Sequence, residues 1–254
     1  MPFTVSHIAA VLPFRGARGR VGRLFGNFPA LAIGAVAPDF SYILWLVGPH
    51  FEAHTLSGLF FVAWPFALVG YVVYRRLLEG PWSTLLPWLR DRGAPHRVDS
   101  VLVGTLLGAT THVFLDAFTH YDGFFVELWP WLSTPFVHAL NRNFAIYAAF
   151  QHAGGLIGGA FVVAAITHAI GKSPERRFTT SWRTCAYLFG AWLALSGAVL
   201  VVPIRRLLYG IGYEHPLDFW VNSAFRVLGT SILAMIGYAV LVRFQRKPSS
   251  INAS

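Results

Sequence analysis

The sequence predicts an all-α fold: a polytopic integral membrane helical bundle of about six membrane segments, including a short N-terminal hairpin. Of its 254 residues, 55% are hydrophobic and 12% are charged, and the mean hydropathy is +0.54. Because soluble domains carry about 25% charged residues, the composition excludes a soluble fold. No polar stretch is long enough to bury a core of its own. We therefore expect one membrane-embedded domain at residues 1–247 and a disordered tail at 248–254.

The N-terminal region predicts the short hairpin. Its first apolar stretch, Thr4–Phe14, is too short to cross a bilayer, and no basic residue precedes it as in a signal peptide. A turn rich in Arg and Gly follows at 15–26, and then an apolar run at Phe28–Val47. If the two stretches form a hairpin, the helical rise of about 1.5 Å per residue brings His7 and Asp39 to a similar level.

Five further apolar runs approach the length that crosses a bilayer. Lys and Arg gather in alternate connections between the runs, which places those connections and both termini in the cytoplasm. We expect the protein in the inner membrane of a bacterial cell. The runs are Ser57–Tyr74, Ser100–Phe118, Phe144–Ile170, Thr184–Val202 and Phe219–Val242.

The formal net charge is +9, and the sequence pI is about 10.2. Membrane topology explains this excess, since the basic residues lie in the connections and no nucleic-acid-binding motif is present. The predicted partner is the lipid bilayer and not nucleic acid; the oligomeric state is left open.

Glycines recur four residues apart in two of the runs. Such G-x-x-x-G patterns let the backbones of membrane helices approach closely. We expect close helix packing at Gly104 and Gly108, and again at Gly154, Gly155, Gly158 and Gly159.

His112 and Asp116 form the strongest candidate pair. A spacing of four residues places both side chains on one face of a helix, and His120 continues that face. Ionisable groups within a membrane are costly and are usually functional. An imidazole and a carboxylate so placed can bind one metal ion. A His–Asp hydrogen bond that ties two helices together is the alternative.

Further polar residues lie within or beside apolar segments, near the same non-cytoplasmic level. Asp39 follows Pro38, which interrupts a helix and opens a polar pocket; a capping role for Asp39 is the alternative. Arg226 lies two turns inside the last run, as a clamp for a phosphate or carboxylate group or as an ion-pair partner. The predicted metal ligands are His7, Asp39, His54, His112, Asp116 and His152.

Several motifs, taken in order, resemble an uncharacterised bacterial family of small polytopic membrane proteins. The resemblance covers about the first 160 residues. Its motifs are Met1-Pro2-Phe3-Thr4-Val5-Ser6-His7, Ala37-Pro38-Asp39-Phe40, His54-Thr55-Leu56-Ser57-Gly58-Leu59, His112 to His120, and Gln151-His152.

The order His, Asp, His, His-x-x-x-Asp is also similar to membrane-bound metal-dependent hydrolases and to the all-helical zinc-dependent phospholipase C and single-strand nuclease family. This resemblance implies a principal zinc site, an additional ligand in His7, and an Asp116 that bridges to a second ion. That family continues with His-x-x-x-Glu, whereas Leu156 stands four residues after His152. One or two ions are therefore expected. The principal site would consist of Asp39, His54, His112 and Asp116.

The predicted function is that of a metal-dependent hydrolase, a phosphoesterase on a phospholipid-like substrate. Asp39 or Asp116 would orient water, and Arg226 would hold substrate charge. Two alternatives stay open. One is a transporter or a lipid- or metal-binding module whose His/Asp cluster relays protons or an ion. The other is an assembly protein in which the cluster locks helices together.

Overall fold

The computed structural model describes residues 4–15, 19–40, 52–81, 97–139, 142–171, 182–208 and 216–245. The chain divides into two compact units. The first comprises residues 1–41, 51–72 and 91–173, and the second comprises 42–50, 73–90 and 174–254. The expected tail at 248–254 lies outside the described residues, and the single membrane-embedded domain stays a prediction.

The described residues are mostly helical, and five of their helices are long and apolar enough to cross a membrane. These helices overlap the five predicted runs, so the prediction of a helical membrane protein is confirmed at this level. Two shorter apolar helices, Thr4–Phe14 and Phe28–Asp39, correspond to the expected hairpin. The exact number of segments and the side of each terminus stay predictions. The five helices are Leu56–Pro81, Val98–Asp116, Ile146–Ala169, Ala186–Arg205 and Arg226–Arg243.

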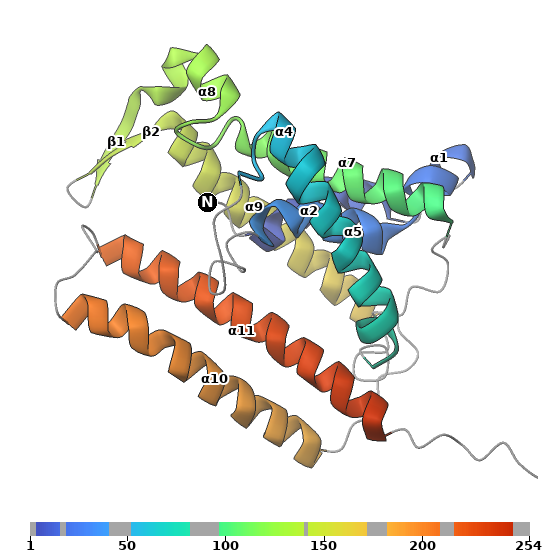
Figure 1. Cartoon of the computed structure of the whole chain (residues 1–254). Helices are drawn as coiled ribbons and strands as arrows, with labels where there is room; N and C mark the ends of the chain where they lie inside the picture. Colours follow the sequence, from blue (N-terminus) through green and yellow to red (C-terminus); the bar gives the residue numbers. More distant parts are fainter. Residues whose placement is uncertain are drawn as a thin grey trace, which may run out of the picture. The chain divides into compact units, whose positions relative to one another are not determined.

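Figure 1 shows the described helices and the β-hairpin, coloured in chain order. The first unit contains η1 (Thr4–Phe14), α1 (Gly19–Phe25), α2 (Phe28–Val36), η2 (Ala37–Asp39), α4 (Leu56–Gly58), η3 (Leu59–Ala63), α5 (Trp64–Val73), α7 (Val98–Asp116), α8 (Phe124–Leu128), η6 (Pro130–Ser133), β1 (Pro135–Ala139), β2 (Arg142–Ala145) and α9 (Ile146–Gly171). The second contains η4 (Tyr74–Leu78), α10 (Trp182–Leu208) and α11 (Pro216–Gln245).

The tight packing of α2 on α7 is the centre of the first unit (Figure 1). It depends on glycine, as the G-x-x-x-G pattern predicted. A Cβ atom on Gly108 would collide with the carbonyl oxygen of Leu31 and would lie 2.7 Å from the amide nitrogen of Ala35. A Cβ atom on Gly34 would collide with the carbonyl oxygen of Thr105. The two backbones can touch only because both positions lack a side chain.

The start of α2 is fixed by Asn27, which is fully buried. Its side-chain oxygen accepts a hydrogen bond from the amide of Ala30 (3.2 Å), as a helix N-cap does. Its amide group donates to the hydroxyl oxygen of Tyr71 (2.9 Å). One side chain thus caps α2 and anchors it to α5.

On another side of the unit, α9 packs against η1. A Cβ atom on Gly158 would lie 2.8 Å from the carbonyl oxygen of Ser6, so close packing was correctly expected here. At Gly154 and Gly159, however, no atom lies within 4 Å of such a Cβ atom. The contact between α9 and η1 is therefore close at Gly158 and open at Gly154.

A short antiparallel hairpin of β1 and β2 precedes α9. The sequence analysis predicted no strand in this region, so it missed the hairpin. Phe136, Val137 and Phe144 are residue types that favour strands. His138 and Asn143 form a facing pair, with the His Nδ1 2.8 Å from the Asn side-chain oxygen.

In the second unit, α10 and α11 pack side by side in antiparallel directions. The indole nitrogen of Trp192 donates to the hydroxyl of Ser231 (3.0 Å). The hydroxyls of Ser196 and Thr230 lie 2.8 Å apart. Polar side chains often join helices in this way inside membranes, where no water competes.

Candidate metal centre

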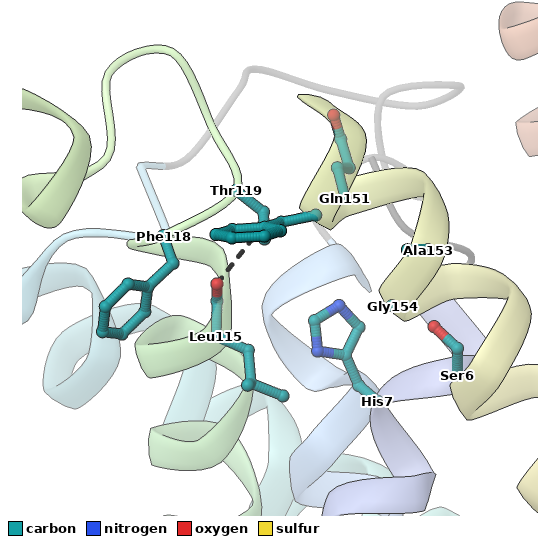
Figure 2. Close-up of a pocket in the computed structure, with 9 residues that line it drawn as sticks. Ser6, His7, Leu115, Phe118, Thr119, Gln151, Ala153 and Gly154 are labelled. Carbon is teal, nitrogen blue, oxygen red and sulfur yellow. Dashed lines mark hydrogen bonds between the residues drawn. The ribbon is translucent and has the colours of Figure 1, made fainter. Parts of the chain in front are cut away.

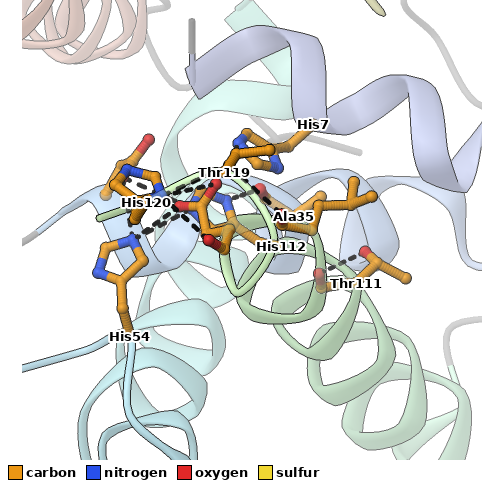
Figure 3. Close-up of polar contacts among 11 residues, drawn as sticks. His7, Ala35, His54, Thr111, His112, Thr119 and His120 are labelled. Atoms are coloured by element: carbon orange, nitrogen blue, oxygen red, sulfur yellow. Dashed lines mark hydrogen bonds and ion pairs between the residues drawn. The ribbon is translucent and has the colours of Figure 1, made fainter. Parts of the chain in front are cut away.

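Four of the predicted ligands, Asp39, His54, His112 and Asp116, converge in the first unit. They come from η2, the segment before α4, and α7. Their ligand atoms all lie within 4.8 Å of one another. Figure 3 shows His54, His112, His7 and His120 gathered around one point. A cluster that could hold a metal ion therefore forms from chain segments far apart in the sequence.

The end of α2 orients His112. Because Pro38 has no amide hydrogen, the amide of Ala37 bonds to Gly34 instead, and the chain continues into η2. The carbonyl of Ala35 then accepts from Nδ1 of His112 at 2.7 Å (Figure 3). A carbonyl only accepts, so the hydrogen is assigned to Nδ1. The Nε2 atom of His112 thus directs its lone pair into the cluster, as metal-binding histidines do.

His54 is positioned by the start of the helix that follows it. The hydroxyl of Thr55 accepts a hydrogen bond from the amide of Gly58 (2.9 Å), which caps α4. A Cβ atom on Gly58 would collide with the carbonyl oxygen of Glu52, so the chain turns back tightly here. The side chain of His54 remains 26% exposed, which makes it the cluster residue with access to the outside.

The spacing of the four ligand atoms matches a tetrahedral ion. In such a site, metal–ligand bonds of about 2.0–2.1 Å place neighbouring ligand atoms about 3.3–3.4 Å apart. Here Nε2 of His54 and Nε2 of His112 lie 3.3 Å apart. Each of these nitrogens lies 3.2–3.5 Å from Oδ1 of Asp39 and from Oδ2 of Asp116. The five distances that involve the two imidazole nitrogens therefore match the spacing around one zinc-sized cation.

The charges in the cluster favour a cation. Asp39 and Asp116 are 2% and 4% exposed, so two carboxylates lie buried close together. Among the described residues, no Lys or Arg forms an ion pair with either carboxylate. Oδ1 of Asp39 is also buried, 3.4 Å from Nε2 of His54 and 3.5 Å from Nε2 of His112. Buried charges are costly unless they are paired, and a divalent cation would neutralise both.

The second oxygen of Asp116 faces a different pair of residues. Its Oδ1 atom lies 3.4 Å from Nε2 of His7 and 3.6 Å from Nδ1 of His120. The ring of His7 stacks on that of His112 at 3.7 Å. Both ring nitrogens of His7, Nε2 of His120 and Oδ1 of Asp116 are buried without hydrogen-bond partners. Each of the two carboxylate oxygens of Asp116 therefore faces a different group of histidine nitrogens.

The two carboxylates change the pKa of His54. Burial alone would lower its pKa, but hydrogen bonding to Asp116 and Asp39 outweighs this and raises its pKa above the usual value. A metal ion that binds here must therefore displace a proton.

One predicted ligand, His152, is not brought into the cluster. The side chain of His152 is exposed on α9, with its ring 6.3 Å from that of Phe144, while its neighbour Gln151 is buried. Arg226 lies on α11 in the second unit, and its role stays a prediction. His120, which the sequence places on the same helix face, lies against Asp116, with its Nδ1 3.2 Å from the backbone carbonyl oxygen and 3.6 Å from Oδ1.

The fold and the cluster define a helical membrane protein with a buried His/Asp centre that could hold a metal ion. The family described as "Domain of unknown function (DUF4184)" matches residues 1–243, and the chain belongs to this family. The predicted membership of an uncharacterised family is thereby confirmed. No curated protein and no solved structure matches the chain.

Proposed function

We propose that this protein is a membrane-embedded, metal-dependent hydrolase, a phosphoesterase acting on a phospholipid-like substrate. The observation that carries this proposal is the tetrahedral spacing of two imidazole nitrogens and two buried carboxylates. Imidazole together with carboxylate suits zinc, whereas magnesium and calcium prefer oxygen ligands alone. Two carboxylates and two neutral imidazoles also balance the charge of one zinc ion.

A second ion would explain the donors around Oδ1 of Asp116. Oδ1 of Asp116 and Nε2 of His7 lie 3.4 Å apart and would supply two of its ligands, whereas Nδ1 of His120 lies 3.2 Å from the carbonyl oxygen of Asp116 and carries its hydrogen there. The four-ligand group leaves no position of a tetrahedral ion free. We therefore assign a holding role to the four-ligand group and place substrate access at the His7 side of Asp116. Asp116 would bridge the two ions.

A bound divalent ion supplies a coordinated water with a pKa near neutrality and polarises a phosphoryl oxygen. In the proposed reaction, the water oxygen attacks phosphorus and the bond from phosphorus to the lipid oxygen breaks. One water proton ends on that leaving oxygen, so the products are a phosphate monoester and an alcohol. Asp39 and Asp116 orient the water.

The proposed location is the bacterial inner membrane, with the centre near the non-cytoplasmic side. The alternation of Arg-rich connections supports this orientation, since such clusters remain in the cytoplasm. His112 and Asp116 lie at the end of α7 opposite the basic segment at 90–97.

Hydrolysis of bis(p-nitrophenyl) phosphate by the detergent-purified full chain tests the proposal. We expect activity that disappears when a chelator removes the metal and returns when zinc is added. His54→Gln is expected to lower this activity by about 100-fold or more, because a metal ligand is lost at a partly exposed position where folding tolerates the change. His168→Gln, an exposed histidine on α9, is the matched control and should retain full activity.

Two results would contradict this function. The first is activity that is insensitive to the chelator, and the second is equal activity in the His54→Gln and His168→Gln proteins. Zinc binding without hydrolysis of any phosphodiester would instead favour the non-enzymatic alternative, a metal-binding or metal-transporting protein. Metal uptake into proteoliposomes would then separate transport from simple binding.

A further inference from the structure

A cavity of about 350 Å³ lies beside the His/Asp cluster, between the end of α7 and the first turns of α9. Figure 2 shows His7 and Ser6 at one side of it, Leu115 and Phe118 at another, and α9 along a third. Its volume lies within the range of small-molecule sites. The origin of this space is visible in the glycine pattern of α9.

Gly154 and Gly158 lie on the same face of α9, one turn apart. Gly158 touches the backbone of η1 at Ser6, whereas a Cβ atom on Gly154 would meet nothing within 4 Å. The helix therefore closes on η1 at one glycine and leaves the space open at the other. A side chain at position 154 would project into the cavity, whose walls include this residue.

The cavity is apolar and uncharged along most of its wall. Leu115, Phe118, Phe150 and Ala153 contribute hydrocarbon surface, and among the described residues no Asp, Glu, Lys or Arg lines it. Its polar lining residues are Ser6, His7, Thr119 and Gln151. Of these, His7 reaches the candidate metal centre, with its Nε2 3.4 Å from Oδ1 of Asp116. The cavity thus runs from an apolar wall to an imidazole that belongs to the candidate metal centre.

The outer side of this cavity faces the surface of two candidate membrane-spanning helices. Leu115 on α7 is 41% exposed and Phe150 on α9 is 48% exposed, although both line the cavity. Large exposed apolar side chains on membrane-spanning helices contact lipid chains. A hydrocarbon chain can therefore enter sideways from the bilayer without crossing a polar barrier.

We propose that this cavity binds one hydrocarbon chain of a membrane phospholipid and places its phosphodiester at the His7 side of the metal centre. This inference rests on the proposed function, because it assigns the substrate of the same centre. It also specifies the route, which is lateral entry between α7 and α9.

The test is photo-crosslinking of the full chain in vesicles of phosphatidylethanolamine and phosphatidylglycerol. The probe is a phosphatidylcholine with a diazirine at the middle of one acyl chain, and crosslinked peptides are identified by mass spectrometry. We expect enrichment at Phe118 and Phe150 over Phe161, an exposed residue of α9 outside the cavity wall. In Gly154→Leu, labelling at the two cavity residues should fall to the level of Phe161.

Gly159→Leu is the matched control, since its Cβ atom also meets nothing within 4 Å and the residue is not part of the cavity wall. It should keep the wild-type labelling pattern. Ala153→Leu, at an exposed position of the same wall, is the second blocking variant if Gly154→Leu does not fold. Equal labelling of Phe118, Phe150 and Phe161 in wild type, or no loss in either blocking variant, would overturn the proposal.

Hydrolysis separates this inference from the proposed function. In Gly154→Leu, kcat/KM for a long-chain phospholipid should fall relative to kcat/KM for bis(p-nitrophenyl) phosphate. A wild-type protein that hydrolyses the soluble diester but shows no cavity labelling would overturn the lipid site alone. A protein that shows cavity labelling but neither binds zinc nor hydrolyses any diester would overturn the proposed function and, with it, the catalytic placement of the phosphodiester.

Discussion

Replacing Asp116 by Asn is expected to remove bound zinc and to lower phosphodiester hydrolysis by about 100-fold or more. The two carboxylate oxygens of Asp116 contact different histidines. Oδ2 lies 3.2 Å from Nε2 of His112, and Oδ1 lies 3.4 Å from Nε2 of His7. The amide has the same shape but no negative charge, so it neutralises neither ion and can bridge none. The loss should exceed that of any other single ligand.

Asp122→Asn is the control for this variant, because Asp122 is an exposed carboxylate a few residues further along the chain. It should bind zinc and hydrolyse the diester as the wild type does. Zinc content and rate are measured on both proteins after purification in the same detergent. Wild-type zinc content in Asp116→Asn would show that the carboxylate is not a ligand.

The second large effect is expected at Gly108, where α7 touches the backbone of α2. In Gly108→Ala the added methyl group must displace the carbonyl of Leu31 and the amide of Ala35. Overpacking of this kind costs about 1–3 kcal/mol, which corresponds to a fall of roughly 5 °C in the midpoint of thermal unfolding. Separation of the helices also moves the carbonyl of Ala35 away from His112. Zinc affinity should therefore fall by about 10- to 100-fold, as for the loss of an outer-shell partner.

Gly159→Ala provides the comparison, because nothing lies within 4 Å of its Cβ position. It is expected to keep the wild-type zinc affinity and to unfold at the same temperature or slightly higher, since alanine favours helix over glycine by about 0.5–1 kcal/mol. Thermal unfolding in detergent and competition with a zinc chelator measure the two effects. Identical behaviour of the two variants would contradict the close packing of α2 on α7.

The helical membrane class and the His112–Asp116 pair could be predicted from the sequence, because both are local properties. Apolar runs of sufficient length indicate spanning helices whatever surrounds them. The pairing of His112 with Asp116 follows from helical spacing alone. The convergence of Asp39 and His54 on that pair was expected from the order of motifs and a common level, not from local geometry.

The other features depend on contacts between distant segments. The bond from His112 to the carbonyl of Ala35 exists only because two glycines let α2 touch α7. His152 was expected at the same depth as the cluster, but this depth alone does not bring its side chain into the cluster. Successive helical residues point about 100° apart, and α9 turns Gln151 inward and His152 outward. The depth of a residue in the membrane can be predicted from topology. The direction in which its side chain points around the helix depends on how the helices pack.

Elemental analysis of the detergent-purified full chain most directly tests whether the cluster is a metal centre. We expect zinc at one or two ions per chain in the wild type and a loss of the principal ion in Asp39→Ala, because Asp39 is a buried member of the four-residue cluster that would hold that ion. Asp122→Ala should retain the wild-type zinc content. A wild-type protein without stoichiometric metal, or an Asp39→Ala protein with the same content as the wild type, would contradict the assignment.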